Sequence, residues 1–187
     1  MNGTFRQSIK VTSGAITSIA TIVFAYILYA KGIHLNLTTW LLILLLDSIG
    51  LILVYKGGDT RPWLLIGWTT AALCVVIAII ITGGRVTLTA VEAITLSLAV
   101  FAIWQWLRSG KPVIGLRWQS IAMWLSSLPM LYDFWRQPQP WTWWLWAITI
   151  ICCVTEVAAT DDRSEIKILV QLSAIGLNTI ALGLVLH

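Results

Sequence analysis

Long apolar stretches alternate with short polar breaks along the whole of the 187-residue chain. An α-helix needs about 20 apolar residues to cross a hydrocarbon core of about 30 Å, and seven stretches approach that length. Gly, Pro and charged residues mark each break and predict a helix end there. Because the breaks are short, we expect consecutive helices to be antiparallel neighbours in an all-α membrane fold. The predicted membrane-spanning helices cover residues 13–31, 37–56, 62–82, 86–108, 114–134, 141–159 and 166–186.

The composition agrees with this pattern. Hydrophobic residues make up 58% of the chain and charged residues only 11%, whereas a soluble domain usually carries about 25% charged residues. The predicted spans leave no room for a separate soluble domain, which excludes a soluble enzyme, a nucleic-acid-binding module, a coiled coil and a disordered protein. The first apolar stretch has the length of a full span and no small-residue cleavage site, so we expect no cleaved signal peptide.

The basic residues predict an orientation. Nine of the 12 Lys and Arg residues lie on the same side of the predicted spans as the N-terminus, and only Lys31, Arg85 and Arg136 lie on the other side. Basic residues gather on the cytoplasmic side of membrane proteins. We therefore expect a protein of the plasma (inner) membrane with a cytoplasmic N-terminus and with His187 outside. No nucleic-acid partner is inferred from the net charge of +4.

A weak internal repeat relates the two ends of the chain. When the sequence is shifted by 103 residues, Tyr29 aligns with Tyr132, Thr39-Trp40 with Thr142-Trp143, and Asp59 with Asp162. Chance matches are common between chains rich in Leu and Ile, but this recurrence in one register predicts a true repeat. It makes residues 13–82 and 114–186 two equivalent three-helix bundles and residues 86–108 a linker helix. One intervening span brings the second bundle back parallel to the first.

Three segments resemble a known family of membrane proteins. Residues 128–136 read LPMLYDFWR and residues 141–146 read WTWWLW, and residues 104–108 read WQWLR. The first two are similar to the motif of the PQ-loop clan, in which Pro-Gln precedes an aromatic and a basic residue and a Trp-rich helix follows. The third is similar to a helix ending of the PnuC branch. Met130 stands at the place of the clan's glutamine.

The PQ-loop clan includes the SWEET sugar facilitators, the PnuC vitamin-precursor transporters and the KDEL receptor. The resemblance implies seven helices arranged as two parallel three-helix bundles joined by a linker helix. It also implies a small-solute transporter that works by alternating access on a sugar-, nucleoside- or vitamin-like substrate. The alternative is a non-transporting receptor or assembly subunit with the same architecture.

Asp47 is the sharpest candidate for a functional residue. It lies in the middle of an otherwise apolar span, where a carboxylate costs about 2.5–3.5 kcal/mol even on the most lenient insertion scale. Trp40, Ile43 and Asp47 are spaced to share one helix face. We expect Asp47 to bind substrate or a proton. The alternative is a protonated Asp47 that bonds to a neighbouring helix for purely structural reasons.

The other acidic candidates lie nearer the ends of their spans. Glu92 is predicted about six residues into the fourth span and is a second candidate proton site, although pairing with Arg85 would make it structural. Glu156 lies near the cytoplasmic end of the sixth span, where we expect it to reach the interface beside Arg163.

Amides and aromatic residues complete the predicted substrate site. Gln171 and Asn178 are seven residues apart and are expected on one face of the last helix, although such amides also serve only to join helices. Trp40 and Trp143 occupy equivalent positions of the repeat, which predicts that they face each other across one cavity and stack on a ring of the solute. The alternative is that these Trp residues merely fill the core.

No other pattern of residues indicates chemistry. The sequence contains no His/Cys cluster with metal spacing, no phosphate-binding loop and no Ser/His/Asp set. Cys74, Cys152 and Cys153 are expected to be small core residues. We therefore expect no enzyme, no metal and no cofactor. The expected partners are the lipid bilayer and a small polar or aromatic solute, and a homo-oligomer stays open.

Overall fold

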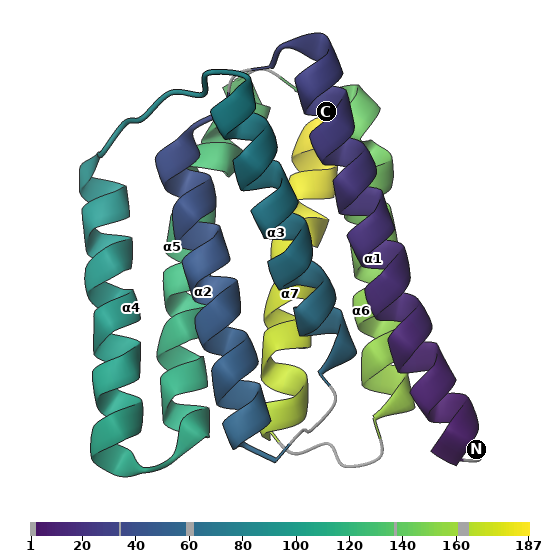
Figure 1. Ribbon diagram of the computed structural model, residues 1–187, viewed down its shortest axis with the longest axis vertical. Coiled ribbons are helices and arrows are strands. Elements are labelled where there is room, and N and C mark those ends of the chain that lie inside the picture. The colour runs from purple at the N-terminus through teal and green to yellow at the C-terminus, as the bar shows by residue number, and fades with distance from the viewer. Residues whose placement is uncertain (1–2, 34, 59–61, 137, 161–164) are drawn as a thin grey trace.

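Seven α-helices and one 3-10 turn make up nearly all of the described structure (Figure 1). The computed structural model describes residues 3–33, 35–58, 62–136, 138–160 and 165–187, and no β-strand occurs among them. The helices are α1 (Gly3–Lys31), α2 (Leu37–Lys56), α3 (Trp63–Ile81), α4 (Ala90–Ser109), α5 (Pro112–Arg136), α6 (Trp143–Ala159) and α7 (Glu165–Leu186). The 3-10 turn η1 (Pro140–Thr142) directly precedes α6.

Each predicted span corresponds to one helix, and most ends agree within a few residues. Glycines in the left-handed conformation follow several helices, among them Gly110 after α4, where φ is +65°. A residue with a Cβ is disfavoured there, which explains why the breaks end the helices. The start of α1 was predicted too late, at residue 13. The polar segment before it contains no proline, so the helix continues back to Gly3.

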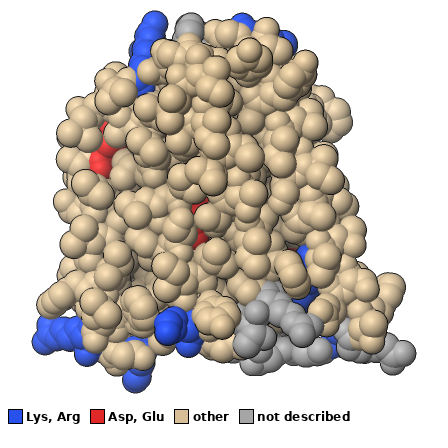
Figure 2. Space-filling view, in the orientation of Figure 1, with Lys and Arg blue, Asp and Glu red and all other residues tan. Residues whose placement is uncertain are grey.

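Six of these helices are long and apolar enough to cross a membrane. The exception is α5, which is 25 residues long. Its polar residues face inward: Gln119, Ser120, Ser126 and Ser127 are all buried. Throughout the described chain, many large apolar side chains are exposed, an arrangement that a soluble protein avoids. In Figure 2 most Lys and Arg side chains lie toward the two ends of the molecule. These features are consistent with an integral membrane protein.

The contacts between helices follow a regular scheme. In the first part of the chain α3 packs against both α1 and α2, and in the last part α7 packs against both α5 and α6. Four further contacts join these groups: those of α1 with α6 and of α2 with α5 are large, and those of α2 with α7 and of α3 with α6 are small. The remaining helix, α4, packs on α5 and more lightly on α2 at one edge of the bundle (Figure 1).

Small residues allow α1 and α3 to approach closely. A Cβ added to Gly67 of α3 would lie 2.6 Å from the carbonyl oxygen of Gly14 in α1. A Cβ added to Gly14 would lie 2.6 Å from the carbonyl oxygen of Trp63. Such contacts between small residues are typical of helices that associate in lipid.

Separate apolar clusters occupy the two ends of the bundle. One includes Phe24, Leu28 and Ile79, near the ends of α1 and α3. Another includes Leu53 and Leu116, near the end of α2 and the start of α5. The polar interior of the bundle lies between these clusters.

Candidate functional site

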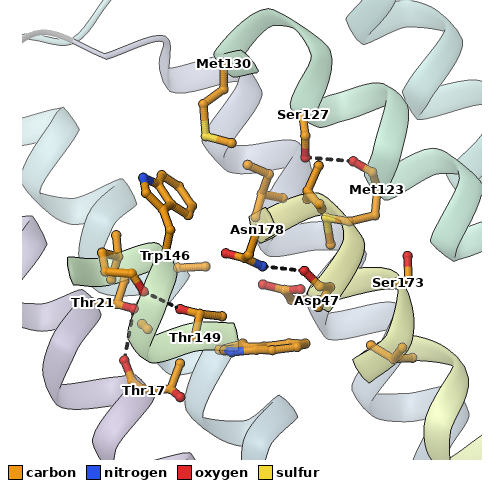
Figure 3. A pocket seen from close by; sticks show the side chains of 18 of the residues that line it. Thr17, Thr21, Asp47, Met123, Ser127, Met130, Trp146, Thr149, Ser173 and Asn178 are labelled. Carbon is orange, nitrogen blue, oxygen red and sulfur yellow. Dashed lines mark hydrogen bonds between the residues drawn. The ribbon is translucent and has the colours of Figure 1, made fainter. Parts of the chain in front are cut away.

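A cavity of about 150 Å³ lies inside the bundle (Figure 3). Side chains of α1, α2, α3, α5, α6 and α7 line it, whereas none of the described lining residues comes from α4. Its polar lining residues are Thr17, Thr21, Asp47, Gln119, Ser120, Ser127, Thr149, Ser173 and Asn178. Three Trp and two Met side chains supply much of the rest: Trp40, Trp68, Trp146, Met123 and Met130.

Asp47 brings the only carboxylate to the described lining of this cavity. At a rise of 1.5 Å per residue it lies about 15 Å along α2, which is near the middle of the helix. Its side chain is 7% exposed. Among the described residues no hydrogen bond or ion pair reaches this carboxylate. Asp47 is therefore a buried acid whose oxygen atoms face the cavity without a partner among the described residues, a costly arrangement in an apolar medium.

Asn178 of α7 lies next to Asp47 on the cavity wall (Figure 3). Its amide Nδ2 donates a hydrogen bond of 2.7 Å to the carbonyl oxygen of Ala174, one turn earlier in the same helix. This bond orients the amide. The structure places Asp47, Asn178 and Trp40 in the wall of one cavity, and the prediction that they bind a solute there stays a prediction.

The hydroxyl groups of the wall present oxygen lone pairs rather than protons to the cavity. Thr17, Thr21, Thr149 and Ser127 each donate to a backbone carbonyl four residues earlier, at 2.8–3.0 Å. A hydroxyl has one proton and two lone pairs, so each of these groups keeps only acceptor capacity. The amide Nε2 of Gln119 likewise donates to the carbonyl oxygen of Leu46, at 3.1 Å. The polar wall is thus rich in acceptors.

Ser173 and Ser120 are the exceptions among the hydroxyl groups. Ser173 accepts a hydrogen bond of 2.8 Å from the indole Nε1 of Trp124, which leaves its own proton available. The hydroxyl of Ser120 is buried and has no hydrogen-bond partner among the described residues. The cavity therefore also contains a small number of donors.

Trp143 is not part of this site, and the prediction that it faces Trp40 across the cavity is wrong. Its side chain is 51% exposed. Trp143 is the first residue of α6, and Trp146, one turn further into the helix, lines the cavity instead. The indole Nε1 of Trp146 donates to the hydroxyl of Thr142, at 3.2 Å. Residues 140–142 form a 3-10 turn where the equivalent residues 37–39 of the repeat are α-helical, so Trp40 and Trp143 do not occupy equivalent places.

Gln171 does not line the cavity with Asn178, contrary to the prediction. Its side chain is buried, and its Oε1 atom has no hydrogen-bond partner among the described residues. The two amides do lie on a similar face of α7, but Gln171 is two turns nearer the start of the helix. Val170 is the lining residue at that level.

Glu92 also lies outside the cavity. The helix α4 begins at Ala90 rather than at the predicted residue 86, so Glu92 falls in the first turn and forms a capping box with Thr89. Its carboxylate accepts hydrogen bonds from the backbone N–H of Thr89, at 2.8 Å, and from the Thr89 hydroxyl. It also accepts bonds from the Asn36 amide and the Thr39 hydroxyl, both at 3.3 Å. These contacts join the starts of α2 and α4.

Glu156 is buried at the end of α6 rather than reaching the surface. Its predicted neighbour Arg163 lies outside the described residues. The hydroxyl of Ser13 on α1 and that of Thr155 on α6 lie 2.9 Å apart close by. Glu156 is not among the lining residues of the cavity.

Several lining residues were not predicted as a site, among them Thr17, Thr149 and Met123. Ser and Thr are common in apolar helices and usually bond to their own backbone, so no local pattern distinguishes those that face a cavity. Comparisons with models of protein families, with curated proteins and with solved structures found no match to this chain. The interpretation of the site therefore depends on its own geometry.

Proposed function

We propose that this protein is a small-solute membrane transporter that works by alternating access and binds a sugar-, nucleoside- or vitamin-like solute in the central cavity. The observation that carries the proposal is the cavity itself. It lies at the middle of the bundle, combines aromatic side chains with a few polar groups, and contains the buried Asp47, which has no partner in the part of the chain that the structure describes. Ligand sites typically combine apolar walls with a few oriented polar groups, and intramembrane acids usually mark solute or proton pathways.

The scheme of helix contacts supports two equivalent halves. If α1, α2 and α3 are replaced by α5, α6 and α7 respectively, each contact within the first group becomes a contact within the second. The same exchange converts the α1–α6 contact into the α5–α2 contact. This relation favours two three-helix bundles, residues 13–82 and 114–186, with residues 86–108 as the linker. It is the arrangement that the resemblance to the PQ-loop clan implies.

Alternating access requires the two halves to rock about the cavity. Polar bonds between described residues join the halves, among them the bond between Ser13 of α1 and Thr155 of α6 and the bond that Gln119 of α5 donates to Leu46 of α2. The face of the bundle at which the N-terminus lies is called the N-terminal face. Ser13, Thr155 and Gln119 lie in the part of their helix that is nearer this face, and Leu46 lies near the middle of α2. In the proposed cycle these bonds hold that face closed and separate when it opens. The charge distribution favours a cytoplasmic location for this face, in the plasma (inner) membrane.

Counterflow in proteoliposomes tests the proposed function. Vesicles containing the purified chain are loaded with unlabelled solute, and entry of the labelled solute is followed for a panel of sugars, nucleosides and vitamins. We expect transient accumulation of at least one labelled solute above the level in protein-free vesicles, because a carrier exchanges solutes through one site. If a solute binds the protein but shows no counterflow, transport is rejected and the alternative, a receptor or assembly subunit, is favoured.

A further inference from the structure

Building on the proposed function, we infer that the solute is a small organic cation with a single ring, held by the Asp47 carboxylate between the indole rings of Trp40, Trp68 and Trp146. The inference narrows the substrate class of the central cavity. It depends on four properties of the cavity: its single acidic group, the polarity of its hydrogen-bonding groups, its aromatic residues and its size.

The described lining of the cavity has one acidic group and no basic group. Asp47 lines it, and the described lining contains no Lys, Arg or His that would neutralise this carboxylate. A buried charge is stable only when it is paired or coordinated. Since no described residue pairs with Asp47, a cation in the cavity would hold its side chain in the ionised form and complete the site, whereas an anion would meet a like charge in a medium of low dielectric constant.

The hydrogen-bonding groups of the wall also favour a cation over an anion. The hydroxyl groups of Thr17, Thr21, Thr149 and Ser127 have already donated their protons to backbone carbonyls. The Oε1 atom of Gln119 is buried and has no partner among the described residues. These oxygen atoms can only accept hydrogen bonds, so they match a solute that is rich in N–H donors, such as an ammonium or amidinium group.

The aromatic residues add a second attraction for a cation. Trp40, Trp68 and Trp146 come from three different helices and line the same cavity as Asp47. The face of an indole ring attracts cations, by about 2 kcal/mol or more when the site is dry. Met123 and Met130 add polarisable sulfur atoms that contact aromatic rings favourably. An aromatic wall beside one carboxylate suits a ring with a cationic group better than it suits a neutral sugar.

The volume of the cavity limits the size of the solute. An apolar cavity of about 150 Å³ in another protein binds benzene, and the present cavity has about the same volume. One six-membered ring with a short substituent therefore fits without movement of the helices.

Calorimetric titration of the full chain in lipid nanodiscs tests the inference with three probes of similar size. Benzylammonium, benzyl alcohol and benzoate are titrated at pH 7, and heats of partitioning are subtracted with protein-free nanodiscs. We expect benzylammonium to bind about 10- to 100-fold more tightly than benzyl alcohol, the range expected for a hydrogen bond to a charged group. We expect no binding of benzoate.

Asp47→Asn, which has nearly the same shape, is expected to reduce the preference for benzylammonium over benzyl alcohol to less than about threefold. Glu156→Gln is the matched control, since it makes the same chemical change at a buried carboxylate outside the cavity, and it should leave the preference unchanged. The inference is overturned if benzyl alcohol binds the unmodified chain as tightly as benzylammonium does, or if the preference persists in Asp47→Asn. The comparison of probes on the unmodified chain decides the question even if a variant does not fold.

The proposed transport function can fail separately. Binding of benzylammonium that depends on Asp47, together with an absence of counterflow in proteoliposomes, would retain the cation site and reject transport. Counterflow of a neutral sugar without any binding of benzylammonium would retain transport and reject the cation site.

Discussion

Asp47 of α2 and Asn178 of α7 lie side by side on the wall of one cavity, although they are far apart in the sequence (Figure 3). The Asn178 amide is held by the backbone of its own helix, whereas no hydrogen bond from a described residue reaches the Asp47 carboxylate. This difference separates the two interpretations of Asp47. A residue retained to join helices would be bonded to a neighbouring helix, while a residue retained to bind a solute is left with its oxygen atoms free.

Asp47→Asn should therefore stabilise the folded protein while it removes the cation preference. Replacing the carboxylate with an amide relieves part of the cost of about 2.5–3.5 kcal/mol for an acid at the centre of a bilayer. We expect the variant to gain about 1–2 kcal/mol and to unfold a few degrees higher in thermal denaturation of the purified protein. A lower unfolding temperature would instead indicate that Asp47 has a structural role.

Trp146 and Trp143 should differ in their effect on solute binding. Trp146→Leu removes an indole from the cavity wall, and we expect the affinity for benzylammonium to fall by about 2- to 30-fold, equivalent to ~0.5–2 kcal/mol. Trp143→Leu changes an exposed side chain at the start of α6 and should alter this affinity by less than about twofold. Equal losses of affinity in the two variants, measured by the same titration, would contradict the place of Trp146 in the cavity wall and of Trp143 outside it.

Close packing of α1 on α3 predicts a large difference between two Gly→Ala substitutions. In Gly67→Ala the new Cβ would lie 2.6 Å from the Gly14 carbonyl oxygen, and we expect a loss of about 1–3 kcal/mol in the free energy of unfolding. Gly183→Ala is the matched control, because no atom lies within 4 Å of its added Cβ. Since alanine favours a helix over glycine, the control should gain up to about 1 kcal/mol. Chemical denaturation in detergent compares the two, and similar values would contradict the packing.

Glu92 should behave as a capping residue. Glu92→Gln keeps an acceptor for the backbone N–H of Thr89, because Gln also forms capping boxes, and should cost little stability. Glu92→Ala leaves the donors of Thr89, Asn36 and Thr39 without their shared acceptor, and we expect a loss of about 1–3 kcal/mol. Thermal unfolding distinguishes the two variants. If both lose solute binding but keep their stability, Glu92 belongs to the solute pathway instead.

The hydrophobic pattern predicted the helices well because lipid imposes a simple rule, a run of about 20 apolar residues closed by Gly, Pro or charge. Asp47 and Asn178 could be found for a related reason, since a polar residue in the middle of such a run is expensive and conspicuous. The arrangement of the helices in space could not be predicted as well, because no local sequence pattern indicates that α3 contacts both α1 and α2.

Residues near helix ends were the hardest to place. Glu92 was predicted deep in a span because Thr89 was not identified as the cap that starts α4. Trp143 was assigned to the cavity because the repeat aligns it with Trp40, but a 3-10 turn precedes α6 and shifts the equivalent role to Trp146. A displacement of a few residues matters little for the length of a span. It changes which side chain faces a cavity.

Alternating access requires one half of the bundle to rock against the other, and distances between spin labels at both ends of the bundle measure this motion. Two pairs of exposed positions are related by the predicted repeat, Tyr29 with Tyr132 at one end and Tyr55 with Ala158 at the other. The pairs are labelled separately in chains whose three native cysteines are replaced by alanine. On addition of benzylammonium we predict that one distance becomes shorter while the other becomes longer. Distances that stay constant, or that change in the same direction at both ends, would contradict alternating access.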